Sequence, residues 1–246
     1  LALCSSNLSD TTLSPNQSEQ ADDYFNTVLY TGNATDDREV TGVGFKPDWG
    51  WFKERDDTVN HLIFDSSRGA TKQLIVNDDA SESTQANKQK TFTNDGYTLG
   101  TDGQVNGLND LYVVWNWKAN GGTTVSNTQG SITSTVQANT TAGFSIVQYT
   151  GDSTSNDGTP STVGHGLNAV PKFIFTLPLD HFSGAVYHAG NTSAPETERL
   201  ILKSTSGNAM TSDDAGYWND TAPTSTVFSI GTRKHTNSNG GVVAYV

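Results

Sequence analysis

The side chains that could carry out chemistry are scattered along this chain rather than grouped in catalytic spacings. The five histidines show neither the His-x-His nor the His-Glu-x-x-His pattern of a zinc site. No serine stands in the Gly-x-Ser-x-Gly turn of a serine hydrolase. Glycoside hydrolysis needs a carboxyl group whose pKa is raised by apolar surroundings, and every glutamate lies in a polar segment. We therefore expect that the protein is not an enzyme.

Adjacent aspartates are the other chemically suggestive pattern. Loops rich in carboxylate oxygens can bind Ca²⁺, but none of these follows the twelve-residue calcium loop with its terminal glutamate. Aspartate side chains also cap turns in their own right. We predict solvated turns and no cofactor, with Ca²⁺ as the alternative. The candidate positions are Asp36-Asp37, Asp56-Asp57, Asp78-Asp79 and Asp213-Asp214, with Asp152, Asn156 and Asp157 in one further loop.

Two pairs of tryptophans, Trp49 with Trp51 and Trp115 with Trp117, are each spaced two residues apart. On a β-strand this spacing points both rings to one face of the sheet. An exposed face of indoles would stack on sugar rings, whereas a buried face would fill a core. We favour the core, because the matching positions in the second half of the chain hold other large side chains: Phe173, Phe175 and Tyr245.

Trp218 differs from the other tryptophans because it has no aromatic residue two positions away and stands among loop-forming residues. Its neighbours, Tyr217 and Asn219, add a second ring and a hydrogen-bonding amide. Loops on a rigid scaffold are common binding elements. We therefore predict an exposed contact here, with Trp218, Tyr217 and Asn219 as ligand-binding residues.

The segment Asp65-Ser66-Ser67-Arg68-Gly69 places an acid three residues before a base at the end of a predicted strand. Glycine adopts left-handed backbone conformations without strain, so Gly69 suits a tight turn. We predict that Asp65 and Arg68 form a local ion pair that braces this turn. Such a pair would contribute little to stability if it were exposed.

Composition narrows the class of protein. The 246 residues include 14 Lys and Arg against 26 Asp and Glu, a formal net charge of −12, and only 33% are hydrophobic. No run approaches the roughly 20 apolar residues that cross a bilayer, and an acidic chain without basic clusters does not suit nucleic acid. The single cysteine, Cys4, excludes an intrachain disulfide and a cysteine-based zinc site. We expect neither membrane insertion nor nucleic acid as a partner.

The positions of the apolar residues predict short strands and no long helix. Gly, Ser, Thr, Asn and Asp dominate between the apolar runs, and these residues favour turns over helices. No stretch of ten residues has the apolar spacing of a helix. We therefore predict an all-β fold of antiparallel sandwiches of the jelly-roll or lectin-like kind. The predicted strands are 25–30, 48–53, 61–65, 72–76, 96–100, 111–118, 131–136 and 241–246.

An internal repeat is the most informative pattern. The segment 25–32 (FNTVLYTG) recurs as 144–151 (FSIVQYTG), and 111–115 (LYVVW) matches 241–245 (GVVAY). Two tandem sandwich domains of roughly 100 residues are the simplest explanation. Because the chain closes on a strand, we expect it to be a segment of a longer polypeptide. The predicted organisation is a linker or extended arm over 1–24, a first sandwich over 25–118, a linker over 119–130 and a second sandwich over 131–246.

Several short phrases together resemble the repeat-containing virion proteins of marine bacteriophages, a family of tail fibre and tail structural proteins. The similarity covers nearly all of the chain after residue 24. The family brings no catalytic residues, so the resemblance implies no active site. The phrases are 30–33 (YTGN), 64–69 (FDSSRG), 96–100 (GYTLG), 112–118 (YVVWNWK), 130–136 (GSITSTV), 138–144 (ANTTAGF), 163–167 (VGHGL) and 217–219 (YWN).

This resemblance implies a non-enzymatic component of a phage tail fibre or spike. It predicts a protein exposed on the particle that contacts the host surface, with a surface glycan as a candidate ligand. Other virion proteins and further copies of the chain, as a homotrimer, are the expected partners. A chain without disulfides can assemble in a reducing host cytoplasm. A capsid decoration or other architectural virion protein, and a secreted carbohydrate-binding module, are the alternatives.

Overall fold

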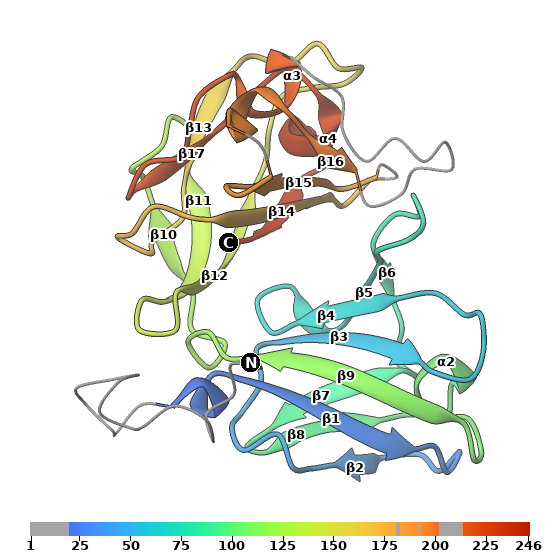
Figure 1. Ribbon diagram of the computed structural model, residues 1–246. Coiled ribbons are helices and arrows are strands. Elements are labelled where there is room, and N and C mark those ends of the chain that lie inside the picture. The colour runs from blue at the N-terminus through green and yellow to red at the C-terminus, as the bar shows by residue number, and fades with distance from the viewer. Residues whose placement is uncertain (1–19, 181–182, 192, 202–213) are drawn as a thin grey trace.

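The computed structural model describes residues 20–180, 183–191, 193–201 and 214–246 (Figure 1). Short antiparallel strands dominate this part of the chain, so the prediction of an all-β fold is confirmed. The strands fall into two groups that follow one another in the sequence. We call them the N-terminal group (β1 to β9) and the C-terminal group (β10 to β18).

The N-terminal group packs a six-stranded sheet, the first sheet, against a sheet of three strands. Their orders are β1-β9-β3-β4-β5-β6 and β2-β8-β7, and all neighbours are antiparallel. Alternate side chains of the first sheet, such as Phe52 and Val114, meet Tyr97 and Leu99 in a buried core. The strands are β1 (Phe25–Thr31), β2 (Arg38–Val40), β3 (Trp49–Glu54), β4 (Leu62–Asp65), β5 (Gly69–Ile75), β6 (Ser83–Thr84), β7 (Gln89–Thr93), β8 (Gly96–Leu99) and β9 (Leu111–Trp117).

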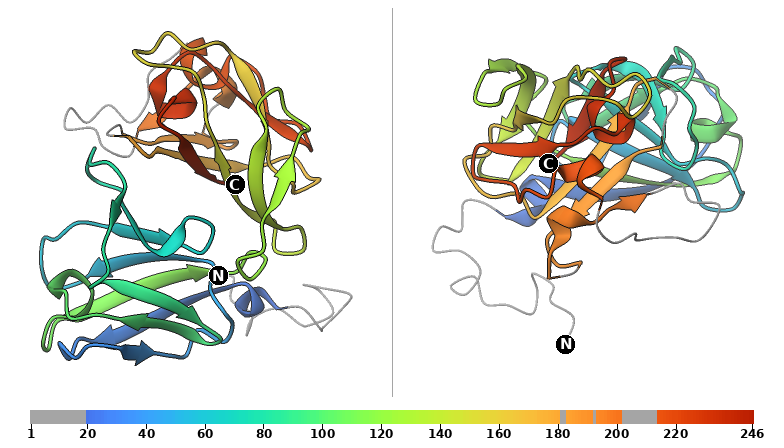
Figure 2. Two further views of the ribbon diagram at one scale, coloured as in Figure 1. Left: turned by 180° about the vertical axis from the view of Figure 1, so that it is seen from behind. Right: turned by 90° about the horizontal axis from the view of Figure 1, so that it is seen from above.

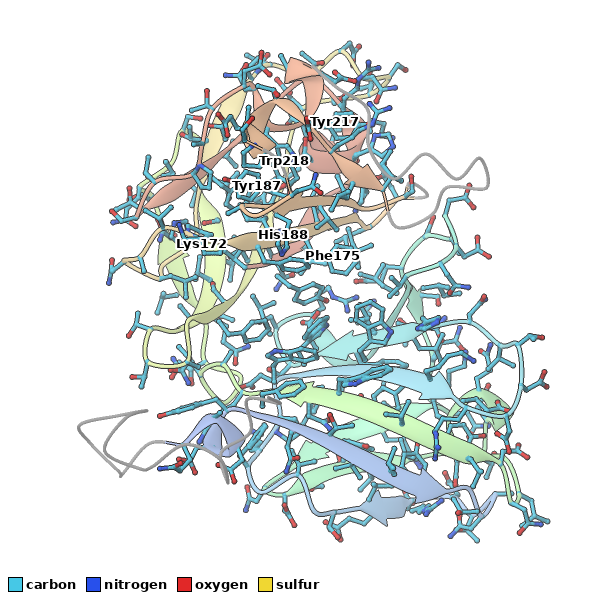
Figure 3. All side chains as sticks on the ribbon, viewed as in Figure 1. Lys172, Phe175, Tyr187, His188, Tyr217 and Trp218 are labelled. Atoms are coloured by element: carbon cyan, nitrogen blue, oxygen red, sulfur yellow. The ribbon has the colours of Figure 1, made fainter. Side chains whose placement is uncertain are left out.

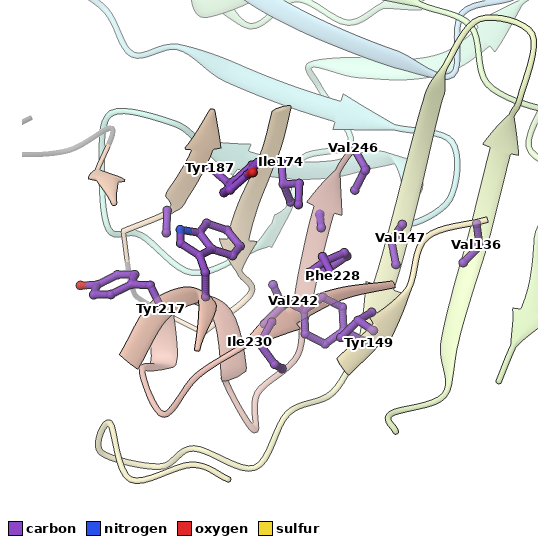
Figure 4. Packing of buried hydrophobic residues seen from close by; sticks show 14 of the residues in the cluster. Val136, Val147, Tyr149, Ile174, Tyr187, Tyr217, Phe228, Ile230, Val242 and Val246 are labelled. Carbon is purple, nitrogen blue, oxygen red and sulfur yellow. The ribbon is translucent and has the colours of Figure 1, made fainter. Parts of the chain in front are cut away.

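The C-terminal group packs a seven-stranded sheet, the second sheet, against the pair β13-β17. The order of the second sheet is β10-β11-β12-β18-β14-β15-β16, again antiparallel throughout. Val147, Tyr149, Phe228 and Ile230 fill the core between the two layers (Figure 4). The strands are β10 (Val125–Asn127), β11 (Ser134–Asn139), β12 (Phe144–Tyr149), β13 (Ser161–Gly164), β14 (Phe173–Pro178), β15 (Ala185–His188), β16 (Leu200–Ile201), β17 (Val227–Ile230) and β18 (Val242–Tyr245).

Helices are confined to single turns among the residues that the structure describes. Aspartate caps begin two of them, because Asp102 accepts a hydrogen bond from the Gln104 N–H and Asp214 accepts one from the Gly216 N–H. No helix in these ranges is long and apolar enough to cross a membrane. The helices are α2 (Gly103–Asn106), α3 (Ala215–Trp218) and α4 (Lys234–Asn237), with 3-10 turns η2 (Ala21–Asp23) and η3 (Pro195–Thr197).

The eight predicted strands match observed strands to within three residues at each end. The predicted linker over 119–130 is less simple, because it contains strand β10, which pairs with β11. Its first residues are fixed as well, since the backbone N–H groups of Ala119 and Gly121 donate to the buried Asp48 carboxylate at 2.8 and 2.9 Å. Most of the predicted arm over 1–24 lies outside the described residues, which include only its last five.

The first and second sheets face one another across the boundary between the two groups (Figures 1 and 2). A third hydrophobic cluster fills this boundary. It joins Trp49, Ile63 and Leu74 of the first sheet to Phe175 and Tyr245 of the second. The first and second sheets therefore each pack on both faces: one face contacts the partner layer of its own sandwich, and the other contacts the second group.

Candidate functional site

The contact between the two sheets is the first feature that could serve a function, because it contains buried charges. Nε of Arg68 lies 2.6 Å from Oδ2 of Asp65, and Nη1 lies 3.0 Å from Oε2 of Glu82. The hydroxyl of Tyr245, from the second sheet, donates to the same Asp65 oxygen at 2.7 Å. We call these four residues the interface ion network; it ties a turn of the N-terminal group to a strand of the other group.

The predicted Asp65–Arg68 pair is thus confirmed, and Gly69 has the left-handed φ of 116° that the turn requires. The pair is buried, because the side chains of Asp65 and Arg68 are 0% and 2% exposed, so the small contribution of an exposed pair does not apply to it. Burial opposes the charge on Arg68, but Asp65, Tyr245 and Glu82 outweigh that effect and raise its pKa. Burial likewise raises the pKa of Tyr245.

An apolar cavity of about 170 Å³, the aromatic cleft, lies beside this network. The two sheets supply opposite walls. Among the lining residues, the rings of Trp49 and Tyr245 stack at 4.6 Å, while Phe173 is 46% exposed to solvent. Figure 3 shows Phe175 at the boundary between the two groups. The other lining residues include Trp51, Trp117 and Phe144.

The same-face prediction for the tryptophan pairs is confirmed by this geometry. Trp49 lies opposite Trp117 and Trp51 opposite Trp115 in the register of β3 and β9, and neighbouring rings contact one another. The prediction of a core position is confirmed for Trp49, which is 4% exposed. The other three are half-buried. Trp49, Trp51 and Trp117 join a core that lies between the two groups rather than inside one sandwich.

A second hollow, the polar groove, has a volume of about 340 Å³ and lies on the second sheet. Thr133, Thr135 and Thr150 are exposed and Gln148 is half-buried along its floor. Within the described ranges none of these four side chains forms a hydrogen bond. Their hydroxyl and amide groups are therefore available to a ligand with several donors and acceptors.

Two of the three residues predicted to form an exposed contact around Trp218 are buried in the structure. Trp218 and Tyr217 are each 2% exposed and belong to the core of the C-terminal group, and Trp218 packs edge-on against Tyr187 at 6.0 Å (Figure 3). The prediction that these rings are exposed is wrong, so a ligand-binding role for them loses its basis. Asn219 is exposed and ends helix α3 in a left-handed conformation.

The acidic positions form turns and ion pairs in the described part of the chain. Asp36 and Asp37 both pair with Lys90. Backbone N–H groups of Ser155 and Thr154 donate to Asp157 and lower its pKa to about 2. Among the described residues there is no group of three His, Cys, Asp or Glu side chains that could hold a metal ion. Asp213 of the pair Asp213-Asp214 lies outside these residues.

Sequence reasoning missed several buried polar residues, among them two asparagines at helix ends and a lysine. Asn106 and Asn237 are fully buried, each at the end of a short helix. Lys88 is 5% exposed and donates to the side-chain oxygens of Gln73 and Gln104. Burial lowers its pKa. All three residues stand in polar stretches, and a polar residue in a polar stretch carries no sign of burial in the sequence.

His235 gives the fold a predicted dependence on pH. Burial, followed by the charges of Arg199 and Arg233, lowers its pKa to about 4, against about 6.5 in an unfolded chain. The unfolded state then binds more protons between these values, so stability falls as pH falls from 6.5 to 4. We expect roughly 2–3 kcal/mol to be lost over this range through His235.

Urea unfolding at several pH values checks this expectation. The difference in stability between the wild type and His235→Gln should shrink by that amount between pH 6.5 and 4, because the variant has no imidazole to protonate. His188→Gln is the control, since His188 is exposed. A difference that stays constant with pH would show that His235 does not titrate as stated.

Comparison with known proteins adds a family. A family model described as Domain of unknown function (DUF7483) matches residues 20–246. The match spans nearly the whole chain, so the chain belongs to this family. Neither the curated proteins nor the solved structures gave a match.

Proposed function

We propose that this member of the DUF7483 family is a non-enzymatic structural protein of a bacteriophage particle, an appendage of the tail-fibre or spike kind that contacts the host surface. The polar groove carries the host-contact part of the proposal. The phage part is supported by the phrases that resemble virion proteins, such as residues 64–69 and 112–118. Recognition of a host surface needs binding without turnover. The polar groove offers hydroxyl and amide groups that can hydrogen-bond a ligand in this way.

The groove suits a surface glycan because sugars are recognised through many modest hydrogen bonds. Three threonine hydroxyls, of Thr133, Thr135 and Thr150, and the amide of Gln148 line a single hollow. Gly240 and Gly241 border it, so the backbone is close to any ligand that enters. No charge lies among the lining residues, which favours a neutral or weakly charged polar ligand.

We also propose that the two strand groups are tandem copies of one sandwich of the jelly-roll or lectin-like kind. The strand order β1-β9-β3-β4-β5 of the first sheet agrees with β12-β18-β14-β15-β16 of the second. Hydrogen bonds support the same correspondence. Tyr30 donates to the Val105 carbonyl, and Tyr149 donates to the Thr236 carbonyl, each at 2.6 Å.

The buried Asn106 and Asn237 occupy matching places in this scheme. The Asn106 amide donates to the Gly100 carbonyl at 2.8 Å, and the Asn237 amide donates to the Gly231 carbonyl at 2.7 Å. The side-chain oxygen of each asparagine accepts a hydrogen bond from the backbone N–H just after a Tyr-Thr-Gly segment: Oδ1 of Asn106 from Asn33, and Oδ1 of Asn237 from Asp152. A repeat of such specific contacts favours duplication over chance similarity.

The resemblance to virion proteins also suggests an assembly. In this proposal three copies of the chain form a homotrimer, which contacts other virion proteins. The trimer is assembled in the host cytoplasm without a cofactor and is displayed on the outside of the particle. The net charge of −12 then belongs to a solvated exterior, which keeps such a surface soluble.

Binding to host cells tests the proposed function. We expect fluorescently labelled protein to bind cells of the host and to compete with particle adsorption. Thr135→Arg should reduce binding at least tenfold, because it fills the polar groove with a bulky charge. Thr27→Arg is the matched control, since Thr27 is also exposed on a strand but lies in the other group.

The outcomes separate the candidate roles. Binding that is lost in Thr135→Arg and kept in Thr27→Arg supports host contact through the groove. A chain that is found on the particle but neither binds cells nor competes with adsorption would instead favour an architectural virion protein. Turnover of a host polysaccharide by the purified chain would overturn the non-enzymatic assignment.

A further inference from the structure

We infer that the aromatic cleft is a socket for one uncharged aromatic ring, presented as a side chain by another polypeptide. The inference rests on the proposed function in one respect, that this polypeptide belongs to the same particle. The walls of the cleft support the socket itself. It is distinct from the polar groove, which lies elsewhere on the second sheet and has no lining residue in common with it.

The cleft continues the hydrophobic contact between the two sheets. Trp49 and Tyr245, which line it from opposite sheets, stack at 4.6 Å and are 4% and 1% exposed. Phe173 lines the same cleft but is 46% exposed. The cleft therefore has buried walls and an open rim at Phe173, where a further group can extend the apolar contact.

The size of the cleft selects a single ring. Its volume is about 170 Å³, and a cavity of about 150 Å³ with apolar walls binds benzene and stays dry without it. Aromatic walls favour an aromatic guest, because ring pairs at centroid distances of 4.5–7 Å gain energy beyond the area that they bury. A second ring or a long aliphatic chain would exceed the space.

The polar atoms of the walls exclude a sugar or a charged group. The Trp51 indole already donates to Nδ1 of His61 at 3.0 Å, and the Tyr245 hydroxyl donates to Asp65. The Trp49 indole N–H is shielded from solvent and has no partner. Sugar hydroxyls inside this cleft would lose hydrogen bonds to water without replacing them, which is costly.

A side chain of a polypeptide fits the open rim better than a free small molecule does. Phe173 stands at this rim with a large exposed surface, so a partner can cover it while its own ring enters the cleft. Contacts between proteins are commonly anchored by one aromatic side chain in a pocket, surrounded by contacts that exclude water. Continuity with the existing apolar interface favours this occupant.

NMR titration of the full chain tests the socket through the indole N–H signals. N-acetylphenylalaninamide represents the side chain of a polypeptide, toluene a free aromatic ring, and methyl glucopyranoside a sugar. We expect the first two to shift the signals of Trp49 and Trp51, with a dissociation constant on the order of 1 mM for one isolated ring. The signal of Trp218 should not move, because Trp218 lies in a different core.

Two exposed residues give a matched pair of variants. Phe173→Asp places a charge at the rim and should weaken binding at least tenfold, whereas Val170→Asp, at a side chain that is 48% exposed and outside the cleft, should leave it unchanged. Failure of both aromatic probes overturns the socket, and so does equal binding by Phe173→Asp. Binding of toluene alone overturns the polypeptide as occupant, and binding of the glucopyranoside overturns the ligand class.

These results stand apart from the test of host contact. A chain that does not bind host cells can still bind the aromatic probes, in which case the proposed function fails and the socket remains. If the chain binds host cells but not the aromatic probes, the socket fails and the proposed function remains.

Discussion

Replacing Arg68 with methionine lowers the free energy of unfolding by about 3–5 kcal/mol in our account, because it leaves a buried carboxylate without its cation. The Asp65 side chain is fully buried, and among the described residues its only charged partner is Arg68. Glu82 and the Tyr245 hydroxyl lose the same guanidinium group. Urea unfolding of the variant and the wild type at pH 7 measures the loss.

Lys72→Met is the matched control for this change. Lys72 also pairs with Glu82, at 3.5 Å, but its side chain is 40% exposed. Exposed pairs contribute at most about 1 kcal/mol. Similar losses in the free energy of unfolding for both variants would contradict a special role for the buried network. They would show that Arg68 contributes no more than an exposed charge.

The second large effect is expected for Trp218→Ala. Removing a large buried aromatic side chain costs about 3–5 kcal/mol, since it combines lost apolar burial with a cavity. Trp218 is 2% exposed and packs among the core residues of the C-terminal group. Thermal or urea unfolding of the variant checks the value.

Phe173→Ala provides the comparison, because Phe173 is large and aromatic but 46% exposed. We expect it to lower stability by at most about 1 kcal/mol. If Trp218→Ala folded as stably as the wild type and lost only a ligand, the original prediction of an exposed contact would be restored and its place in the core would be wrong.

The eight predicted strands could be recognised because they are short segments with recurring apolar residues, bounded by turn-forming residues. The ion pair of Asp65 and Arg68 was also predictable from local sequence. The Asp65–Arg68 pair spans three residues and needs no knowledge of the fold. Its burial was not predictable, because the group that covers it, the Tyr245 hydroxyl, is 180 residues away in the sequence.

Trp218 shows where local reasoning failed. Its segment forms a helix of four residues, too short for the periodicity by which helices are recognised. The signals that remain are the cap at Asp214 and the left-handed Asn219, which mark the two ends of the turn. Read together, they would have predicted a structured turn rather than an open loop.

The aromatic cleft could not be predicted because its walls come from both halves of the chain. The spacing of Trp49 and Trp51 shows that they share a face, but not which surface that face meets. That surface carries Phe173 and Phe175, which the sequence identifies only as their repeat counterparts. Which residues of the two halves face one another depends on how the two groups pack. A local sequence pattern does not contain that information.

The central claim, that this protein is an exposed component of a phage particle, is tested most directly by immunogold electron microscopy of the particles. Antibodies against residues 20–246 should label intact particles at an external appendage and should lose that label when purified protein is added as competitor. Particles that remain unlabelled, while the same antibodies detect the protein free in the lysate, would contradict the claim.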